Sequence, residues 1–360
     1  MREDGTTCII QHDTAVSSRV EDDERARQNR AALMANTQAR CDADPSCAYV
    51  APLVYGDSGD ADSLDAMYPP YWTKVFAVQR ALAMTNPRCA RAAWLDADAT
   101  THDARSTCRA EDGGCETRVR WMSETIDGLF DGRDFFYSRD PTMNPEGEWW
   151  GSEFNAGVFG VANTATGREI VDAWARSYPA DEWHLLKDGR WNTTSDVFGG
   201  PAYEQGSFAG GLLGEYRARG ALREVDACVL NMPCESFDEA SIRGAATCHF
   251  AGKFRNLYLA DYLASLSEAS LGSAPGTYET SPARLHAAAA KVSEPFSKAC
   301  AHKIVSTGLG RSSASRGTGD AQMLFTGAAV VAVIAGAFAA ARRRRRAAAD
   351  ENSLESTPLV

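Results

Sequence analysis

Two carboxylates one residue apart are the feature of this sequence most directly suited to chemistry. Asp96 and Asp98 follow the apolar run at 92–95, which is typical of a short buried strand. Because alternate residues of an extended chain point to one side, both carboxylates can hold the same hard cation. Such a cation, Mn²⁺ or Mg²⁺, also bridges diphosphate oxygens, so the pair favours chemistry on a nucleotide diphosphate. Solvated turns carry the same pair, so further residues must support the assignment.

The segment 96–100 also matches DxDxT, the nucleophile motif of haloacid dehalogenase-type phosphatases. In that motif the first Asp attacks phosphorus and the second acts as acid and base. The chemistry needs a downstream lysine and a further acidic pair at a strand end. Lys187 lies in a polar segment flanked by Gly and Trp, and no such pair follows it. A phosphatase is therefore an alternative with little support.

Three later segments favour a sugar transferase. A neutral imidazole, His249, can complete the shell of an ion held by two Asp, although a strand-end histidine can equally be structural. Gly252 would let the backbone approach a phosphate, and Lys253 would neutralise a departing diphosphate. The second segment, Asn155-Ala156-Gly157, is a turn of small residues that opens a strand. The third, Glu204-Gln205, stands at the start of a helix-like run.

These segments resemble a known family. WTKVFAVQRAL, AAWLDADA, FNAGVFGVANTATGREIVDAW, EQGSF and HFAGK are similar to nucleotide-diphospho-sugar transferases of GT-A fold. Within that fold they resemble the galactosyl/xylosyltransferase family, which includes plant xyloglucan xylosyltransferases and fungal mannan galactosyltransferases. The resemblance covers roughly residues 5–265. It implies an α/β fold with a Rossmann-like mixed sheet flanked by helices. It also implies metal-dependent, retaining transfer of a hexosyl or pentosyl group from a UDP-linked sugar to a glycan or glycoprotein acceptor.

The resemblance assigns a role to each matching residue. Asp96, Asp98 and His249 would ligate Mn²⁺ or Mg²⁺. Gln205 would lie beneath the reacting sugar carbon, beside Glu204, which stands where the family commonly has Asp. The remaining assignments are to nucleotide-sugar binding, by Lys74, Asp96, Asn155, Ala156, Gly157, Gly252 and Lys253. The family often has a spacer between HFxG and its lysine, so Arg255 could share the contact assigned to Lys253. A glycan-binding module without turnover is the main alternative, against which the intact metal and Gln205 positions argue.

The elements that must position these residues follow from periodicity. Strands alternate with helices over the first hundred residues, which favours a parallel sheet. The expected strands lie at 6–11, 48–55, 92–95, 134–138, 157–162, 222–230 and 246–250, and the expected helices at 21–40, 71–84, 166–177, 204–220 and 256–266. The transferase domain would therefore span 1–266. Residues 267–322 are rich in Ser, Ala and Gly, which predicts a stalk with a helix at 283–293.

A membrane segment is expected near the end of the chain. Met323–Ala341 holds 19 uncharged, mostly apolar residues, enough for a helix to cross a bilayer. Arg342–Arg346 follows at once, so the tail at 342–360 should be cytosolic and the body lumenal, in the Golgi or endoplasmic reticulum. A buried Ala-rich helix is the alternative. The family usually has an N-terminal anchor instead. No long apolar stretch follows Met1, so this topology requires an upstream signal sequence.

Composition supports a globular lumenal enzyme. The 360 residues are 44% hydrophobic and 24% charged, with a formal charge of −11, which argues against nucleic acid as a partner. Ten cysteines include three pairs close in sequence, which favours short-loop disulfides formed in an oxidising compartment. Those pairs are Cys41/Cys47, Cys108/Cys115 and Cys228/Cys234. Asn192-Thr193-Thr194 is an N-glycosylation acceptor sequence.

Overall fold

The computed structural model describes residues 5–13, 24–50, 53–55, 61–108, 114–140, 153–195, 199–252, 258–268, 275–279 and 281–291. All of them belong to the first of two units, Met1–Ser312. The expected membrane segment and tail belong to the second unit, Ser313–Val360, and lie outside the described residues. No helix in the described ranges is long and apolar enough to cross a membrane.

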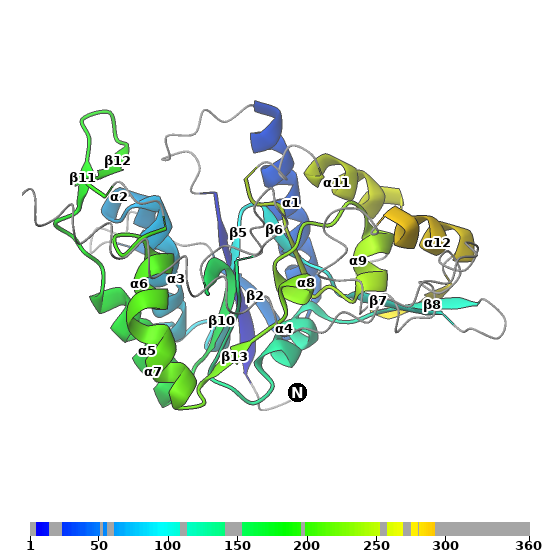
Figure 1. Cartoon of the computed structure of the whole chain (residues 1–360), viewed down its shortest axis with the longest axis horizontal. Helices are drawn as coiled ribbons and strands as arrows, with labels where there is room; N and C mark the ends of the chain where they lie inside the picture. Colours follow the sequence, from blue (N-terminus) through cyan, green and yellow to red (C-terminus); the bar gives the residue numbers. More distant parts are fainter. Residues whose placement is uncertain are drawn as a thin grey trace, which may run out of the picture. The chain divides into compact units, whose positions relative to one another are not determined.

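A six-stranded mixed sheet forms the centre of this unit (Figure 1). Its strand order is β13 (Leu222–Glu224), β9 (Phe135–Ser138), β10 (Asn155–Ala162), β5 (Cys89–Asp96), β1 (Thr6–His12) and β2 (Cys47–Val50). Strand β1 pairs in parallel with β2 and β5, whereas β10 runs antiparallel to β5 and β9. The α/β class and the mixed sheet are confirmed. The parallel pairing expected for the first hundred residues is confirmed for β1, β2 and β5, and the antiparallel strand β10 follows them.

Helices cover both faces of the sheet, which is why its central strands are apolar on both sides. Trp94 of β5 and Phe159 of β10 pack in the core beneath α3 (Pro70–Ala83) and α5 (Ala165–Arg176). Their neighbours Leu95 and Val158 pack on the opposite side against α4 (Met122–Phe130). Alternation along β5 thus places successive side chains in two different cores, and the strand ends at Asp96.

The other elements surround this sheet. The helices are α1 (Glu24–Ala43), α2 (Leu64–Met67), α6 (Glu204–Ser207), the π-helix η2 (Phe208–Leu212), α7 (Leu213–Ala218), α8 (Ala227–Leu230), α9 (Phe237–Arg243), α11 (Leu259–Glu268) and α12 (Pro282–Lys291). The small sheets pair β3 (Leu53–Tyr55) with β4 (Ala61–Ser63), β6 (Ala99–Thr101) with β14 (Thr247–His249), β11 (Trp183–Leu185) with β12 (Trp191–Thr193), and β8 (Cys115–Val119) with both β7 (Ala104–Cys108) and β15 (Gly276–Glu279).

Two sequence expectations need correction here. The expected strand at 222–230 ends at Glu224, and helix α8 follows from Ala227. The expected helix at 204–220 contains the π-helix η2, where two glycines lower helix propensity. Within the expected stalk, β15 pairs with β8, and α12 corresponds to the helix expected at 283–293 and buries Leu285 in a core with Ile242.

The disulfides join both near and distant parts of the chain. Cys41–Cys47 and Cys108–Cys115 confirm two of the short pairs. The third pair is wrong, because Cys234 bonds to Cys248 and Cys228 forms a separate disulfide. Cys8–Cys89 ties β1 to β5 across a separation of 81 residues. Spacing cannot reveal that bond, because only the sheet brings the two cysteines together.

Candidate metal centre

Strand pairing brings the two aspartates and the histidine together. Asp96 ends β5, and a tight turn through Asp98 leads into β6. Strand β14 pairs with β6 and places His249 opposite Ala99. The backbone carbonyl of Asp98 accepts a hydrogen bond from Phe250 N at 2.8 Å. Residues about 150 positions apart in sequence therefore meet at one edge of the central sheet.

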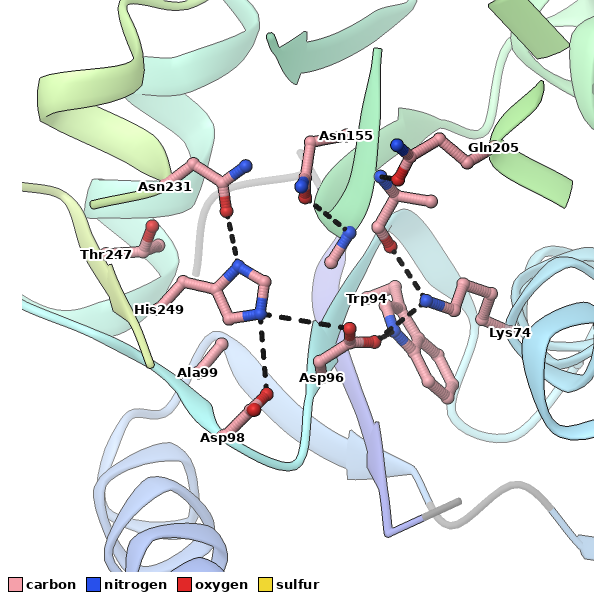
Figure 2. Close-up of polar contacts among 12 residues, drawn as sticks. Lys74, Trp94, Asp96, Asp98, Ala99, Asn155, Gln205, Asn231, Thr247 and His249 are labelled. Carbon is pink, nitrogen blue, oxygen red and sulfur yellow. Dashed lines mark hydrogen bonds and ion pairs between the residues drawn. The ribbon is translucent and has the colours of Figure 1, made fainter. Parts of the chain in front are cut away.

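These three side chains can hold one divalent cation (Figure 2). His249 Nε2 lies 3.4 Å from Asp98 Oδ1 and 3.9 Å from Asp96 Oδ2. One ligand atom from each residue falls within 4.8 Å of the others, the one such group of three in the described part of the chain. Burial lowers the His249 pKa, but the two carboxylates outweigh it and leave the pKa raised. Two carboxylate oxygens and an imidazole nitrogen suit Mn²⁺ and also accept Mg²⁺.

The first residues of β10, at 155–157, fit against the histidine ring. They are already in the strand, so the small-residue turn expected there is wrong. A Cβ on Gly157 would lie 2.1 Å from His249 Cε1, so only glycine lets β10 pass this close. Asn155 Oδ1 accepts a hydrogen bond from Gly157 N at 2.8 Å, which fixes the start of the strand. The small-residue segment found in the sequence therefore adjoins the candidate metal ligands, and steric contact with the His249 ring explains why residue 157 is a glycine.

Asp96 is held through one of its two oxygens. Oδ1 accepts hydrogen bonds from Trp94 Nε1 at 2.7 Å and from Lys74 Nζ at 2.9 Å. The other oxygen, Oδ2, faces His249. This arrangement suits a carboxylate that binds a cation through a single oxygen. Sequence reasoning missed Trp94, although its position two residues before Asp96 puts both on one side of β5.

Lys74 is a buried cation between two carboxylates. Its ammonium lies 3.4 Å from Glu204 Oε1 and donates to Ala156 O at 3.2 Å, in addition to Asp96. Burial lowers the Lys74 pKa, but both carboxylates raise it above the ordinary value. Burial raises the Glu204 pKa, which Lys74 partly offsets. The expected helix lysine therefore supports the site from within rather than lying in solvent.

The other expected residues lie at different distances from this centre. Gln205 Oε1 accepts a hydrogen bond from Ala156 N at 3.2 Å, so α6 is joined to the start of β10. Gly252 is exposed in the turn after β14, with a left-handed φ of +59°. A Cβ there would meet nothing within 4 Å of the described residues, so the space beside Gly252 is open. Lys253 lies outside the described residues.

Asn231 is a site residue that sequence reasoning missed. Its Oδ1 and His249 Nδ1 form a short hydrogen bond (Figure 2). The residue is buried and caps α8, 18 positions before the histidine. No spacing rule links an asparagine after a helix to a strand so far downstream, so only the tertiary structure reveals this pair.

Comparisons with known proteins return structural likenesses only. No family model matches the sequence, and no curated protein matches it. One likeness is a glycosyltransferase involved in glycosylation of the major capsid of PBCV-1, at 14% identity and TM-score 0.39, over 71% of this chain and 99% of that one. Another is the galactosyltransferase LgtC in complex with donor and acceptor sugar analogues, at 10% identity and TM-score 0.33, over 69% and 88%. Function therefore has to rest on the site itself.

Proposed function

We propose that this chain is a glycosyltransferase of GT-A type. It transfers a hexosyl or pentosyl group from a UDP-linked sugar to a glycan or glycoprotein acceptor, with retention of configuration and with Mn²⁺ or Mg²⁺ as cofactor. The observation that carries the proposal is the Asp96–Asp98–His249 group at the edge of a mixed α/β sheet. When bound there, the cation would neutralise the diphosphate of the leaving nucleotide.

The neighbouring residues supply what a sugar transfer needs. The start of β10 at Asn155–Gly157 and the side chain of Gln205 are joined by hydrogen bonds beside the metal ligands. Glu204 Oε2 is buried and makes no hydrogen bond. We assign that oxygen and Gln205 to the face where the donor sugar reacts, because an amide or carboxylate oxygen can stabilise developing positive charge. Lys74 forms ion pairs with both Asp96 and Glu204 beside that face.

The proposal includes a compartment and an anchor. Four disulfides join described residues, and such bonds are typical of oxidising compartments. The apolar segment 323–341 and the arginines after it predict a single span with a lumenal body in the Golgi or endoplasmic reticulum. Lys253 and Gly252 remain proposed diphosphate contacts on the strength of the HFAGK resemblance.

Release of free UDP tests the function. The purified chain is offered a panel of UDP-sugars with Mn²⁺, because transferases hydrolyse their donor slowly even without acceptor. We expect UDP release that EDTA abolishes. Asp96→Ala and Asp98→Ala should each abolish it together with Mn²⁺-dependent UDP binding, because each removes a carboxylate ligand. His249→Ala should weaken the binding less.

Glu116→Ala is the matched control, since this carboxylate is exposed on β8. It should release UDP at the wild-type rate. Donor binding without any UDP release would instead favour a glycan-binding module, and metal-dependent hydrolysis of an aryl phosphate in preference to UDP-sugars would favour the phosphatase. Equal UDP binding by wild type and both Asp variants would remove the metal assignment.

A further inference from the structure

The segment that carries Asn231 is fixed alongside the histidine strand. Ala246 N donates to Val229 O at 2.7 Å, and His249 N donates to Met232 O at 3.1 Å. These two backbone hydrogen bonds lie on either side of Asn231 and leave its side chain facing the imidazole. The Cys234–Cys248 disulfide joins the same two segments. The Asn231–His249 contact is therefore held by backbone on both sides and is not a chance meeting of mobile side chains.

The orientation of the asparagine decides which imidazole nitrogen is free. Oδ1 can accept only from a protonated Nδ1, so this hydrogen bond places the proton on Nδ1. The lone pair of the neutral ring is then on Nε2, the atom that faces Asp98 and Asp96. A donating Asn231 amide would require the proton on Nε2, where no cation could bind. Partners of this kind fix the ring and its tautomer in histidine metal sites.

We propose that Asn231 is a positioning residue of the metal centre. Its carbonyl oxygen holds the Nδ1–H of His249 and so presents Nε2 to the cation. The proposal rests on the proposed function, because it takes the Asp96–Asp98–His249 group as a metal site. It adds a residue for which the sequence resemblance gives no role. It also separates two properties of Asn231, its acceptor oxygen and its volume, that substitutions can test one at a time.

The test compares three variants by their Mn²⁺ affinity. Mn²⁺ is titrated into the full chain with saturating UDP, and free Mn²⁺ is followed by electron paramagnetic resonance. Asn231→Leu removes the acceptor at similar volume and should raise the Kd for Mn²⁺ by about 10–100-fold. Asn231→Asp keeps an acceptor oxygen and should retain a Kd close to wild type. Asn163→Leu is the control, because that side chain bonds Leu82 O and Cys89 O elsewhere in the fold.

The outcomes distinguish a failure of the Asn231 role from a failure of the metal centre on which it rests. A melting temperature for each variant shows whether it is folded, and Asn163→Leu should lower stability without changing the Kd for Mn²⁺. Unchanged affinity in folded Asn231→Leu would overturn the positioning role, as would equal losses in Asn231→Leu and Asn231→Asp. Failure of the wild type itself to bind Mn²⁺ would instead overturn the metal centre and the proposed function with it.

Discussion

At the scale of single residues, the buried charges around Lys74 determine how the site is held. Lys74 is 5% exposed and Glu204 is 3% exposed, so each ion depends on the other. Removing one partner of a buried pair leaves an uncompensated charge, which costs more than removing both. The trio of Lys74, Asp96 and Glu204 is therefore both the support of the site and its most vulnerable part.

Lys74→Met should lower the free energy of unfolding by about 3 kcal/mol at pH 7. Adding Glu204→Gln should restore part of it, because a neutral amide needs no counter-charge. Without the ammonium the Glu204 pKa rises further, so the native state keeps a proton that the unfolded state loses. Stability of the single variant should therefore fall as pH rises from about 4 to 7. Urea unfolding of both single variants and the double variant measures this; additive losses would contradict the pairing.

Gln205→Ala should lower turnover about 100-fold while UDP affinity stays near the wild-type value. The metal ligands and diphosphate contacts are other residues, whereas we place the Gln205 amide at the reacting sugar. Because Gln205 also accepts from Ala156 N, Gln205→Glu serves as a companion that keeps an acceptor oxygen there. Turnover, UDP affinity and melting temperature are measured on each variant. Normal turnover in stably folded Gln205→Ala would remove this residue from the site.

Sequence reasoning reached the ligands of this site and the buried pair Lys74 and Glu204, but it missed two other residues that hold the ligands. Asp96 and Asp98 follow an apolar strand, and that local pattern can be read without a structure. Trp94 and Asn231 bond to those ligands; the i, i+2 spacing places Trp94 beside Asp96, but no sequence signal links Asn231 to His249. The sequence shows that residue 157 is a glycine. It does not show that the ring of His249 lies against this position and excludes a larger residue.

At the scale of elements, the pairing of β14 with β6 brings the histidine to the aspartates, and β10 passes close against its ring. Gly157→Ala should therefore weaken Mn²⁺ binding at least about tenfold, because the new methyl overlaps His249 Cε1 and must displace a ligand. Gly160→Ala is the matched control on the same strand, where a Cβ would overlap Phe136 instead. Both variants should lose stability, by about 1–3 kcal/mol each.

Only Gly157→Ala should change the Mn²⁺ titration, which separates ligand displacement from general overpacking. Equal Mn²⁺ affinities in the two folded variants would show that the ring can move without loss of the metal. The result bears on β10 as a whole, since its antiparallel course brings residues 155–157 to the carboxyl end of β5. Alternation over the first hundred residues did not predict that course, because β10 lies beyond them and alternation does not reveal strand order.

At the scale of the whole molecule, the body was easier to predict than its boundary. Periodicity located most helices and strands of the central sheet because their buried faces are apolar. Composition predicted a stalk after 266 with a helix at 283–293, and in the structure β15 pairs with β8 there and α12 ends at Lys291. Composition could not show how this segment packs, because alanine is common in both stalks and helices. Burial of Leu285 and Ala288 is a tertiary property that composition does not contain.

The last prediction concerns orientation in the membrane. The run Arg342–Arg346 should keep the tail in the cytosol, so that the body with its disulfides lies in the lumen. In microsomes from cells that express the complete reading frame, added protease should remove an epitope placed after Val360 and leave the body intact. Asn192, on strand β12, supplies an internal reporter, because its acceptor sequence is glycosylated only in the lumen.

A glycosidase should therefore shift the mass of the wild-type chain and not that of Asn192→Gln. Replacing the five arginines with glutamates should reduce the fraction of chains in this orientation, since positive residues and not net charge set it. Detergent-opened microsomes control for a body that simply resists protease. If protease digests the body while the tail epitope survives, the orientation is the reverse. The body would then face the cytosol, where its disulfides would not be expected to persist.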